Sequence, residues 1–132
     1  MKILIVDDSP ALAKTLAEAA EMFGCEQIDT VDSGENAIGK AIMADYDLIT
    51  LDVRMEGISG LDALSVLRGV RPRAILALIT AYLDDLDAEV FQAADVVIEK
   101  PFKMETFKNV LGATKEIVER RRTLRSLGVE GL

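Results

Sequence analysis

Short apolar segments alternate with longer amphipathic segments along this chain, and this alternation constrains its fold more than any other feature. Each apolar segment is rich in Ile, Leu and Val and has the length of a strand that is buried on both faces. Strands that alternate with helices through short links form a parallel sheet with helices on both faces and right-handed crossovers. We therefore expect an α/β domain with a doubly wound parallel sheet of five strands and five helices. The expected strands are 2–6, 26–31, 47–51, 74–80 and 96–98.

Local signals place the expected helices between these strands. Ser9 precedes Pro10, which suits the first turn of a helix, and Gly24 provides a C-terminal stop. Ser33 has the side chain to cap the next helix. The expected helices are 10–23, 35–43, 61–67, 84–93 and 104–127.

Composition and charge exclude several classes of function. A chain of 132 residues, half of them hydrophobic, has the size of one domain. The absence of histidine and the single cysteine argue against a zinc site, a Ser-His-Asp triad and an internal disulfide. The net charge of −8 argues against nucleic-acid binding by this domain. Because no apolar run approaches the ~18 residues of a membrane span and the N-terminal run is too short for a signal peptide, we expect a cytoplasmic protein without membrane contact.

Chemically distinctive residues follow the expected strands. Asp7 and Asp8 come after the first strand, Asp52 after the third, Thr80 ends the fourth, and Lys100 follows the fifth. Ligands of open α/β sheets bind in the crevice beyond the carboxyl ends of the strands. We therefore expect three carboxylates, a hydroxyl and an ammonium group to share one crevice.

This set of groups suits phosphoryl transfer. Three clustered carboxylates repel one another unless a cation compensates them, and oxygen ligands without Cys or His favour Mg²⁺. A carboxylate in such a site can attack phosphorus, while Lys100 and Thr80 can bind phosphoryl oxygens. Each residue also has an ordinary structural explanation, such as a helix cap for Asp8 or a strand end for Thr80. The occurrence of all of them at the ends of the correct strands favours the site.

Four stretches of the sequence, taken in order, resemble the receiver domains of bacterial response regulators in two-component signalling. That family has the flavodoxin-like form of the fold expected above. The resemblance covers about residues 1–120 and leaves 121–132 as a basic C-terminal helix extension or tail. The matching stretches are ILIVDDS at 3–9, DLITLDVRM at 47–55, ITA at 79–81 and KPF at 100–102.

The resemblance implies roles for the acidic residues. Asp52 would accept a phosphoryl group from a sensor histidine kinase or a phosphotransfer protein. Asp8 and Asp52 would bind Mg²⁺ directly, Asp7 would act largely through a water molecule, and the backbone carbonyl of Arg54 would complete the protein ligands. The domain would be a signalling phosphoacceptor that transfers and loses its own phosphoryl group, and not an enzyme acting on a separate substrate.

The resemblance also implies features around the fourth and fifth strands. Thr80 and Lys100 would hold the phosphoryl oxygens, and the bond between Lys100 and Pro101 would be cis. The position three residues before the lysine, often aromatic in the family, is Val97 here, which removes the usual switch residue. Tyr82 is an alternative aromatic, or simply an exposed loop residue. The stretch from Thr80 to Lys100 is slightly short for the family, so we expect a truncated or distorted fourth helix.

Three alternatives remain open from the sequence. A metal-dependent phosphatase of the haloacid-dehalogenase kind also uses an aspartyl nucleophile on a parallel sheet. Such phosphatases typically place a second acid two residues after the nucleophile, whereas Ser9 follows Asp7 and Arg54 follows Asp52 at that spacing. A receiver-like scaffold that is never phosphorylated is the second alternative. The third concerns the Arg54 side chain, which either covers the pocket mouth or pairs with Glu56 or an acid near Asp84.

The last helix has two apolar stripes. The first should face the sheet, and the second has heptad-like spacing interrupted by Arg120, which fits a homodimer, a linker to a further domain or a solvated tail. The first stripe comprises Phe107, Leu111, Thr114 and Val118. The second comprises Val110, Ala113, Ile117, Leu124 and Leu127.

Overall fold

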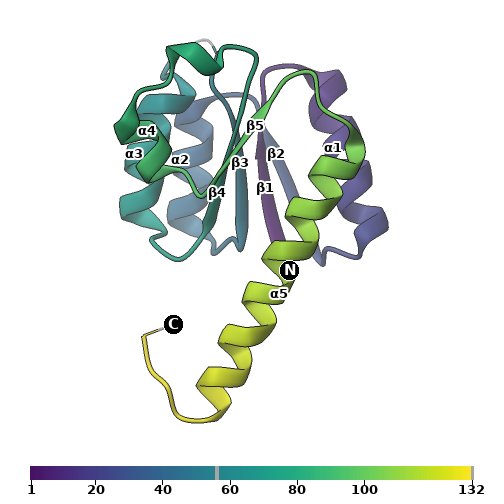
Figure 1. Ribbon diagram of the computed structural model, residues 1–132, viewed down its shortest axis with the longest axis vertical. Helices are drawn as coiled ribbons and strands as arrows, with labels where there is room; N and C mark the ends of the chain where they lie inside the picture. Colours follow the sequence, from purple (N-terminus) through teal and green to yellow (C-terminus); the bar gives the residue numbers. More distant parts are fainter. Residues whose placement is uncertain (56, 132) are drawn as a thin grey trace.

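A parallel sheet in the order β2-β1-β3-β4-β5 forms the centre of the structure, a computed structural model that describes residues 1–55 and 57–131 (Figure 1). β1 and β3 are neighbours in the middle of the sheet, with Val6 opposite Leu51. β3 and β4 are also neighbours, with Asp52 opposite Ile79. The strands are β1 (Lys2–Val6), β2 (Gln27–Val31), β3 (Leu48–Asp52), β4 (Ile75–Thr80) and β5 (Val96–Glu99).

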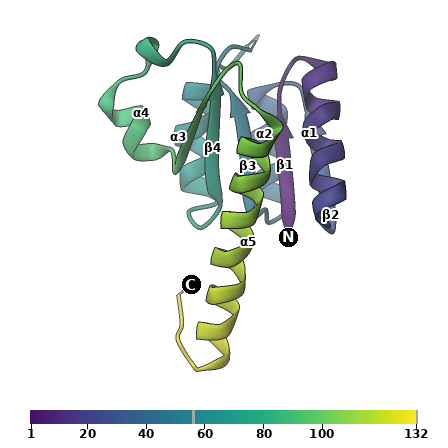
Figure 2. The same ribbon diagram turned by 45° about the vertical axis from the view of Figure 1, so that its right-hand side comes forward.

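Helices cover both faces of the sheet (Figures 1 and 2). α1 and α5 contact each other on one face, whereas α2, α3 and α4 form a contiguous layer on the other. A 3₁₀ turn, η1, precedes α4. The elements are α1 (Pro10–Phe23), α2 (Gly34–Met43), α3 (Gly60–Val70), η1 (Leu83–Asp85), α4 (Ala88–Ala93) and α5 (Met104–Ser126).

The structure confirms the predicted doubly wound α/β fold and the signals at the helix ends. The Ser9 hydroxyl accepts a hydrogen bond from the Leu12 N–H at 3.4 Å, and the Ser33 hydroxyl accepts one from the Asn36 N–H at 3.1 Å. Gly24 ends α1 with a φ of 99°, a left-handed conformation that disfavours side chains. The boundaries differ most at α3, which runs from Gly60 to Val70, and at α4, which begins at Ala88.

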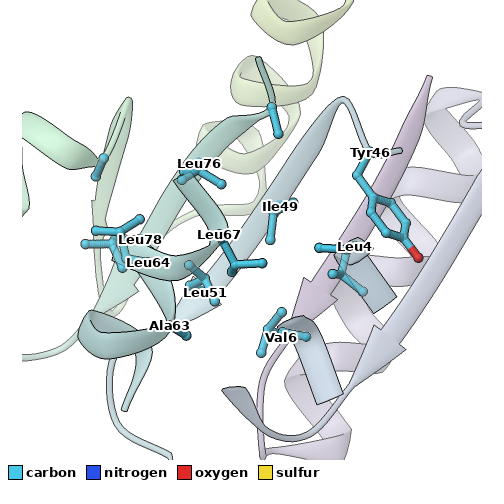
Figure 3. Close-up of a cluster of buried hydrophobic side chains, with 14 of the residues drawn as sticks. Leu4, Val6, Tyr46, Ile49, Leu51, Ala63, Leu64, Leu67, Leu76 and Leu78 are labelled. Carbon is cyan, nitrogen blue, oxygen red and sulfur yellow. The ribbon is translucent and has the colours of Figure 1, made fainter. Parts of the chain in front are cut away.

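Apolar clusters on both sides of the sheet fix the two central strands. One cluster, between the sheet and α2–α4, includes Leu4, Leu51 and Leu67 (Figure 3). The other, against α1 and α5, includes Ile5 and Phe107. Complete burial of such a side chain contributes about 1.5–3 kcal/mol. Because β3 is buried along its whole length, the residues at its carboxyl end have a rigid base.

The fourth helical segment is divided into η1 and the short helix α4. This agrees with the truncated or distorted helix that the sequence predicted for this region. η1 ends at Asp85, and the next residue, Leu86, is extended (φ −90°, ψ 132°) and only 9% exposed because its side chain joins the core. Asp87 then starts α4 by accepting a hydrogen bond from the Val90 N–H at 3.0 Å. Burial of Leu86 therefore interrupts the single helix expected over 84–93.

Arg68 of α3 holds the C-terminal end of α4. Its guanidinium donates to the Ala93 carbonyl at 2.7 Å, the Asp95 carboxylate at 2.6 Å and the Ala74 carbonyl at 3.1 Å. α4 itself, all of whose residues are described, has no residue classed as buried. The segment is thus fixed at its exit and only lightly packed along its length.

α5 has the two predicted stripes. Phe107, Leu111 and Thr114 are buried against the sheet, whereas Ile117 and Leu124 are exposed. The helix continues to Ser126, close to the predicted end, and its C-terminal half projects past the sheet (Figure 1). Among the helices in the described ranges, none has the length and apolar character needed to cross a membrane.

The close approach of α3 to the end of β3 makes a testable demand for glycine at position 60. A Cβ there would overlap the Asp52 carbonyl oxygen and lie 2.9 Å from the Val53 Cα. We expect Gly60→Ala to lower the free energy of unfolding by about 2–3 kcal/mol because the backbone after Asp52 must move. Gly69→Ala, in the open part of the same helix, should raise it by about 0.5–1 kcal/mol. Urea denaturation measures both, and equal effects would contradict the packing argument.

Candidate functional site

The carboxyl ends of β1 and β3 bring three carboxylates together. Asp7 and Asp8 follow β1, and Asp52 is the last residue of β3. One carboxylate oxygen from each of the three lies within 4.8 Å of the others. Asp7 and Asp52 are buried, whereas Asp8 is exposed. The adjacency of the two strands therefore produces the acidic cluster predicted from the sequence.

Asp7 is the least satisfied member of this cluster. Its Oδ1 accepts the Ser9 N–H at 2.8 Å, but its buried Oδ2 has no hydrogen-bond partner among the described residues. Burial raises the pKa of Asp7, the Ser9 hydrogen bond opposes this, and the negative charge of Asp52 adds to the rise. An unpartnered oxygen in a group of oxygen donors fits a hard divalent cation such as Mg²⁺.

Lys100 places a positive charge beside Asp52. Its Nζ lies 3.4 Å from the Asp52 Oδ1, which also accepts the Arg54 N–H at 3.3 Å. The Lys100 N–H donates to the Thr80 carbonyl at 2.7 Å and so fixes the end of β5 against the end of β4. The peptide bond between Lys100 and Pro101 is cis, as the resemblance predicted.

Thr80 lies at the end of β4 with its side chain buried. Its Oγ1 accepts a hydrogen bond from the Tyr82 N–H at 2.9 Å, so the hydroxyl is tied to the following loop. Val97, at the position that is often aromatic in receivers, is half-buried and packs against the cluster under α2–α4. The position that often carries an aromatic residue in receivers is therefore occupied by a small, packed side chain.

The sequence did not predict that Arg54 and Tyr82 contact each other. The Arg54 guanidinium lies over the Tyr82 ring, 3.8 Å from its centroid, and this cation–π stack joins the loops after β3 and β4. Both side chains are largely exposed at the site. The hypothesis that Arg54 pairs with Glu56 concerns a residue outside the described part of the chain. No pattern in the sequence connects positions 54 and 82.

Glu35 is a second contributor that the sequence did not reveal. Its Oε1 accepts the Ile58 N–H at 2.9 Å, and this hydrogen bond lowers the pKa of Glu35. The contact connects the start of α2 with the loop between β3 and α3. The loop after Asp52 is thus braced from the neighbouring helix.

The sheet order and the acidic site define the class of protein. The family model of the response regulator receiver domain matches residues 3–112. The chain therefore belongs to the response-regulator receiver family, with the CheY-like form of the fold. Receivers of this family are signalling domains of two-component systems.

The sequence is also similar to curated response regulators. The chain is 35% identical over 105 residues to the probable transcriptional regulatory protein TcrX of Mycobacterium tuberculosis, covering 78% of this chain and 44% of the relative. It is 31% identical over 115 residues to the nitrate/nitrite response regulator protein NarP of Escherichia coli, covering 85% and 54%. The chain thus spans about half the length of these relatives.

Solved structures extend the comparison. The response regulator TrrA of Thermotoga maritima, in complex with Mg²⁺-BeF, has a TM-score of 0.78 at 34% identity and covers 86% of this chain and 97% of its own. TrrA in complex with the histidine kinase ThkA gives a TM-score of 0.76 over the same shares. A CheY-like receiver domain from Methylobacillus flagellatus gives 0.79 at 28% identity, over 86% and 98%.

The buried charge of Asp7 gives a prediction for stability. We expect Asp7→Asn to raise the melting temperature in metal-free buffer by a few degrees, about 1 kcal/mol, because it removes a buried charge beside Asp52. Since the pKa of Asp7 is raised in the fold, this gain should shrink as pH falls through that pKa and the wild-type carboxyl becomes neutral. Calorimetry at several pH values measures it.

The exposed acid Asp32 provides the matched control. Asp32→Asn changes the net charge equally but should leave the melting temperature nearly unchanged. Millimolar Mg²⁺ should stabilise the wild type and the Asp32 variant more than the Asp7 variant. A larger Mg²⁺ response in Asp7→Asn than in the wild type would contradict the assignment of Asp7 to the cation site.

Proposed function

We propose that this domain accepts a phosphoryl group on Asp52 and changes its interactions in response. The observation that carries the proposal is the position of the Asp52 carboxylate. It lies at the end of the fully buried strand β3, 7% exposed, with Lys100 Nζ 3.4 Å away and two further carboxylates beside it. A nucleophile with restricted water access, a paired cation and a cation-binding cluster are what phosphoryl acceptance needs.

We propose that Asp7, Asp8, Asp52 and the backbone carbonyl of Arg54 hold Mg²⁺. The unpartnered Asp7 oxygen and the carboxylate cluster support this assignment. So does the similarity to TrrA, whose structure is a Mg²⁺-BeF complex. When bound, Mg²⁺ would offset the negative charge of the carboxylates and of the incoming phosphoryl oxygens.

In the proposed transfer, a carboxylate oxygen of Asp52 attacks phosphorus. The bond from phosphorus to the donor nitrogen or oxygen breaks, and its electron pair leaves with the donor. The Lys100 ammonium and the Thr80 hydroxyl then bind oxygens of the phosphoryl group. Attack of water on phosphorus later releases inorganic phosphate and restores the carboxylate, so the domain would lose its own signal without acting on another substrate.

We propose a sensor histidine kinase or a phosphotransfer protein as the donor. The structure of TrrA in complex with ThkA supports this kind of partner. An open depression of about 650 Å³ is lined by Asp7 and Asp8 together with Pro10 and Lys14 of α1, and we propose that a donor approaches the two acids from this side. We further propose that the domain works in the cytoplasm, that no membrane contact is involved and that the domain itself does not bind nucleic acid.

We propose that the receiver ends near residue 120 and that residues 121–132 extend it as a basic segment. We also propose a homodimer through the second stripe of α5. Ile117 is 37% exposed, Leu124 40% and Leu127 74%, and they continue the heptad-like line of Val110. Exposed apolar side chains in register on a projecting helix favour burial against a second copy.

Phosphorylation of Asp52 has a direct test. Incubation with Mg²⁺ and acetyl phosphate should add one hydroxylamine-labile phosphoryl group, detected by intact mass. Asp52→Asn should abolish the addition, whereas Asp84→Asn, which alters an exposed acid, should keep it. Equal labelling of Asp52→Asn and the wild type would refute the site. Sustained hydrolysis of a generic phosphate ester would instead favour the phosphatase alternative.

The dimer has a separate test. Sedimentation velocity at up to several hundred micromolar, with and without beryllofluoride, should detect a dimer. The shift in its equilibrium on activation should be on the order of 1–3 kcal/mol. Leu124→Glu should abolish the dimer because it places a charge in the second stripe of α5. Met22→Glu, which changes an exposed side chain of α1, should not. A wild-type monomer in both states would remove the dimer from the proposal.

A further inference from the structure

Tyr82 is held in place by two contacts, one with Arg54 in the loop after β3 and one with Thr80 at the end of β4. The Arg54 guanidinium stacks on its ring at 3.8 Å, and the Thr80 Oγ1 accepts its backbone N–H at 2.9 Å. Arg54 lies two residues after Asp52, and its backbone N–H donates to the Asp52 Oδ1 at 3.3 Å. Tyr82 is therefore bound by Arg54, from the loop after β3, and by Thr80, at the end of the neighbouring strand β4.

A phosphoryl group on Asp52 would compete for both contacts. It adds negative charge and strong acceptor oxygens, which attract a guanidinium more strongly than an exposed aromatic face does. It also accepts a hydrogen bond from the Thr80 hydroxyl in the proposed function, and rotation of Thr80 toward it takes Oγ1 away from the Tyr82 N–H. The two groups that hold Tyr82 before phosphorylation are thus the groups that phosphorylation recruits.

The segment after Tyr82 has a structure that permits movement. Leu83 and Leu86 anchor it to the core, and Arg68 holds the exit of α4, but none of the residues of α4, all of which are described, is buried. Tyr82 itself is 49% exposed and belongs to neither apolar cluster, so its motion changes few apolar contacts. Val97, at the position that is often aromatic in receivers, is small and already packed against the core. No aromatic side chain at that position can therefore report the state of Thr80.

We propose that the Arg54–Tyr82 stack is the conformational switch of this receiver, closed when Asp52 is free and opened when Asp52 carries a phosphoryl group. The inference rests on the proposed phosphorylation of Asp52. In the opened state Arg54 and Thr80 face the phosphoryl oxygens, and the Tyr82 ring leaves the guanidinium. The loop at the start of η1 then presents a different surface, which takes the place of aromatic rotation at position 97.

The two tyrosines make the switch visible by NMR, since the chain contains no others. Tyr46 donates its hydroxyl to Asp29 and precedes β3, at the opposite edge of the sheet from Asp52, so its ring is an internal control (Figure 3). In protein with ¹³C-labelled tyrosine, Tyr82→Phe assigns the signals. Mg²⁺ with beryllofluoride should move the Tyr82 signal toward its position in Arg54→Met and leave the Tyr46 signal unchanged.

Affinity gives an independent measurement of the same switch. If opening must break the stack, its removal should tighten beryllofluoride binding about two- to fivefold, the factor that corresponds to a cation–π contact at an exposed site. Tyr82→Ala should show this gain because it keeps the backbone N–H but lacks the ring. Tyr82→Phe keeps a ring for the guanidinium and should bind like the wild type. Equal affinity of the two variants would overturn the proposal.

The outcomes separate this inference from the function on which it rests. The ¹⁹F signal of bound beryllofluoride and the mass of the acetyl phosphate product report occupancy of Asp52 directly. Occupancy with an unchanged Tyr82 signal overturns the switch and leaves the phosphoacceptor function standing. Absence of both occupancy and phosphorylation refutes the function and the switch together.

Discussion

Repulsion between buried carboxylates at the ends of β1 and β3 is the constraint on which the site depends. Asp7 and Asp52 are 3% and 7% exposed, and parallel pairing of their strands holds them together. Neither can move away, because the strands behind them are buried on both faces. Lys100 offsets part of the charge, yet the Asp7 Oδ2 keeps no partner among the described residues. The fold thus maintains a cluster of negative charge that a bound cation can offset.

The site combines rigid strands, which hold the carboxylates together, with a lightly packed segment beside β4. The strands that carry Asp7 and Asp52 belong to the core, and Gly60 lets α3 approach the end of β3 so closely that a methyl group would not fit. On the other side of β4, the short helix α4 is held mainly at its ends. In the proposed function, a phosphoryl group on Asp52 would therefore meet carboxylates on buried strands on the β1 side and a lightly packed segment on the β4 side. Marginal local stability is what a segment that changes conformation needs.

Much of this arrangement could be predicted from the sequence, because it depends on order along the chain. Strand–helix alternation fixes a parallel sheet, and the carboxyl ends of its strands meet at one edge, so Asp7, Asp52 and Lys100 could be placed together. The contacts of Arg54 with Tyr82 and of Glu35 with Ile58 could not. They join loops whose approach depends on loop conformation and side-chain rotamers, for which spacing has no signature. The break in the fourth helix was expected from its length, but burial of Leu86 fixes where it occurs.

A change at Asp52 could reach the rest of the domain through Lys100 or through Thr80, and these two sets of contacts differ in strength. Lys100 leads within a few residues to α5, whose Phe107 and Leu111 are completely buried. Displacing that helix would expose two large apolar side chains, a loss of several kcal/mol. Thr80 leads to Tyr82 through a single hydrogen bond and to Arg54 through one stack, contacts worth about 1 kcal/mol each. In the proposed switch, phosphorylation would act first through these weaker contacts, so the β4–α4 loop would move while Phe107 and Leu111 keep the start of α5 in place.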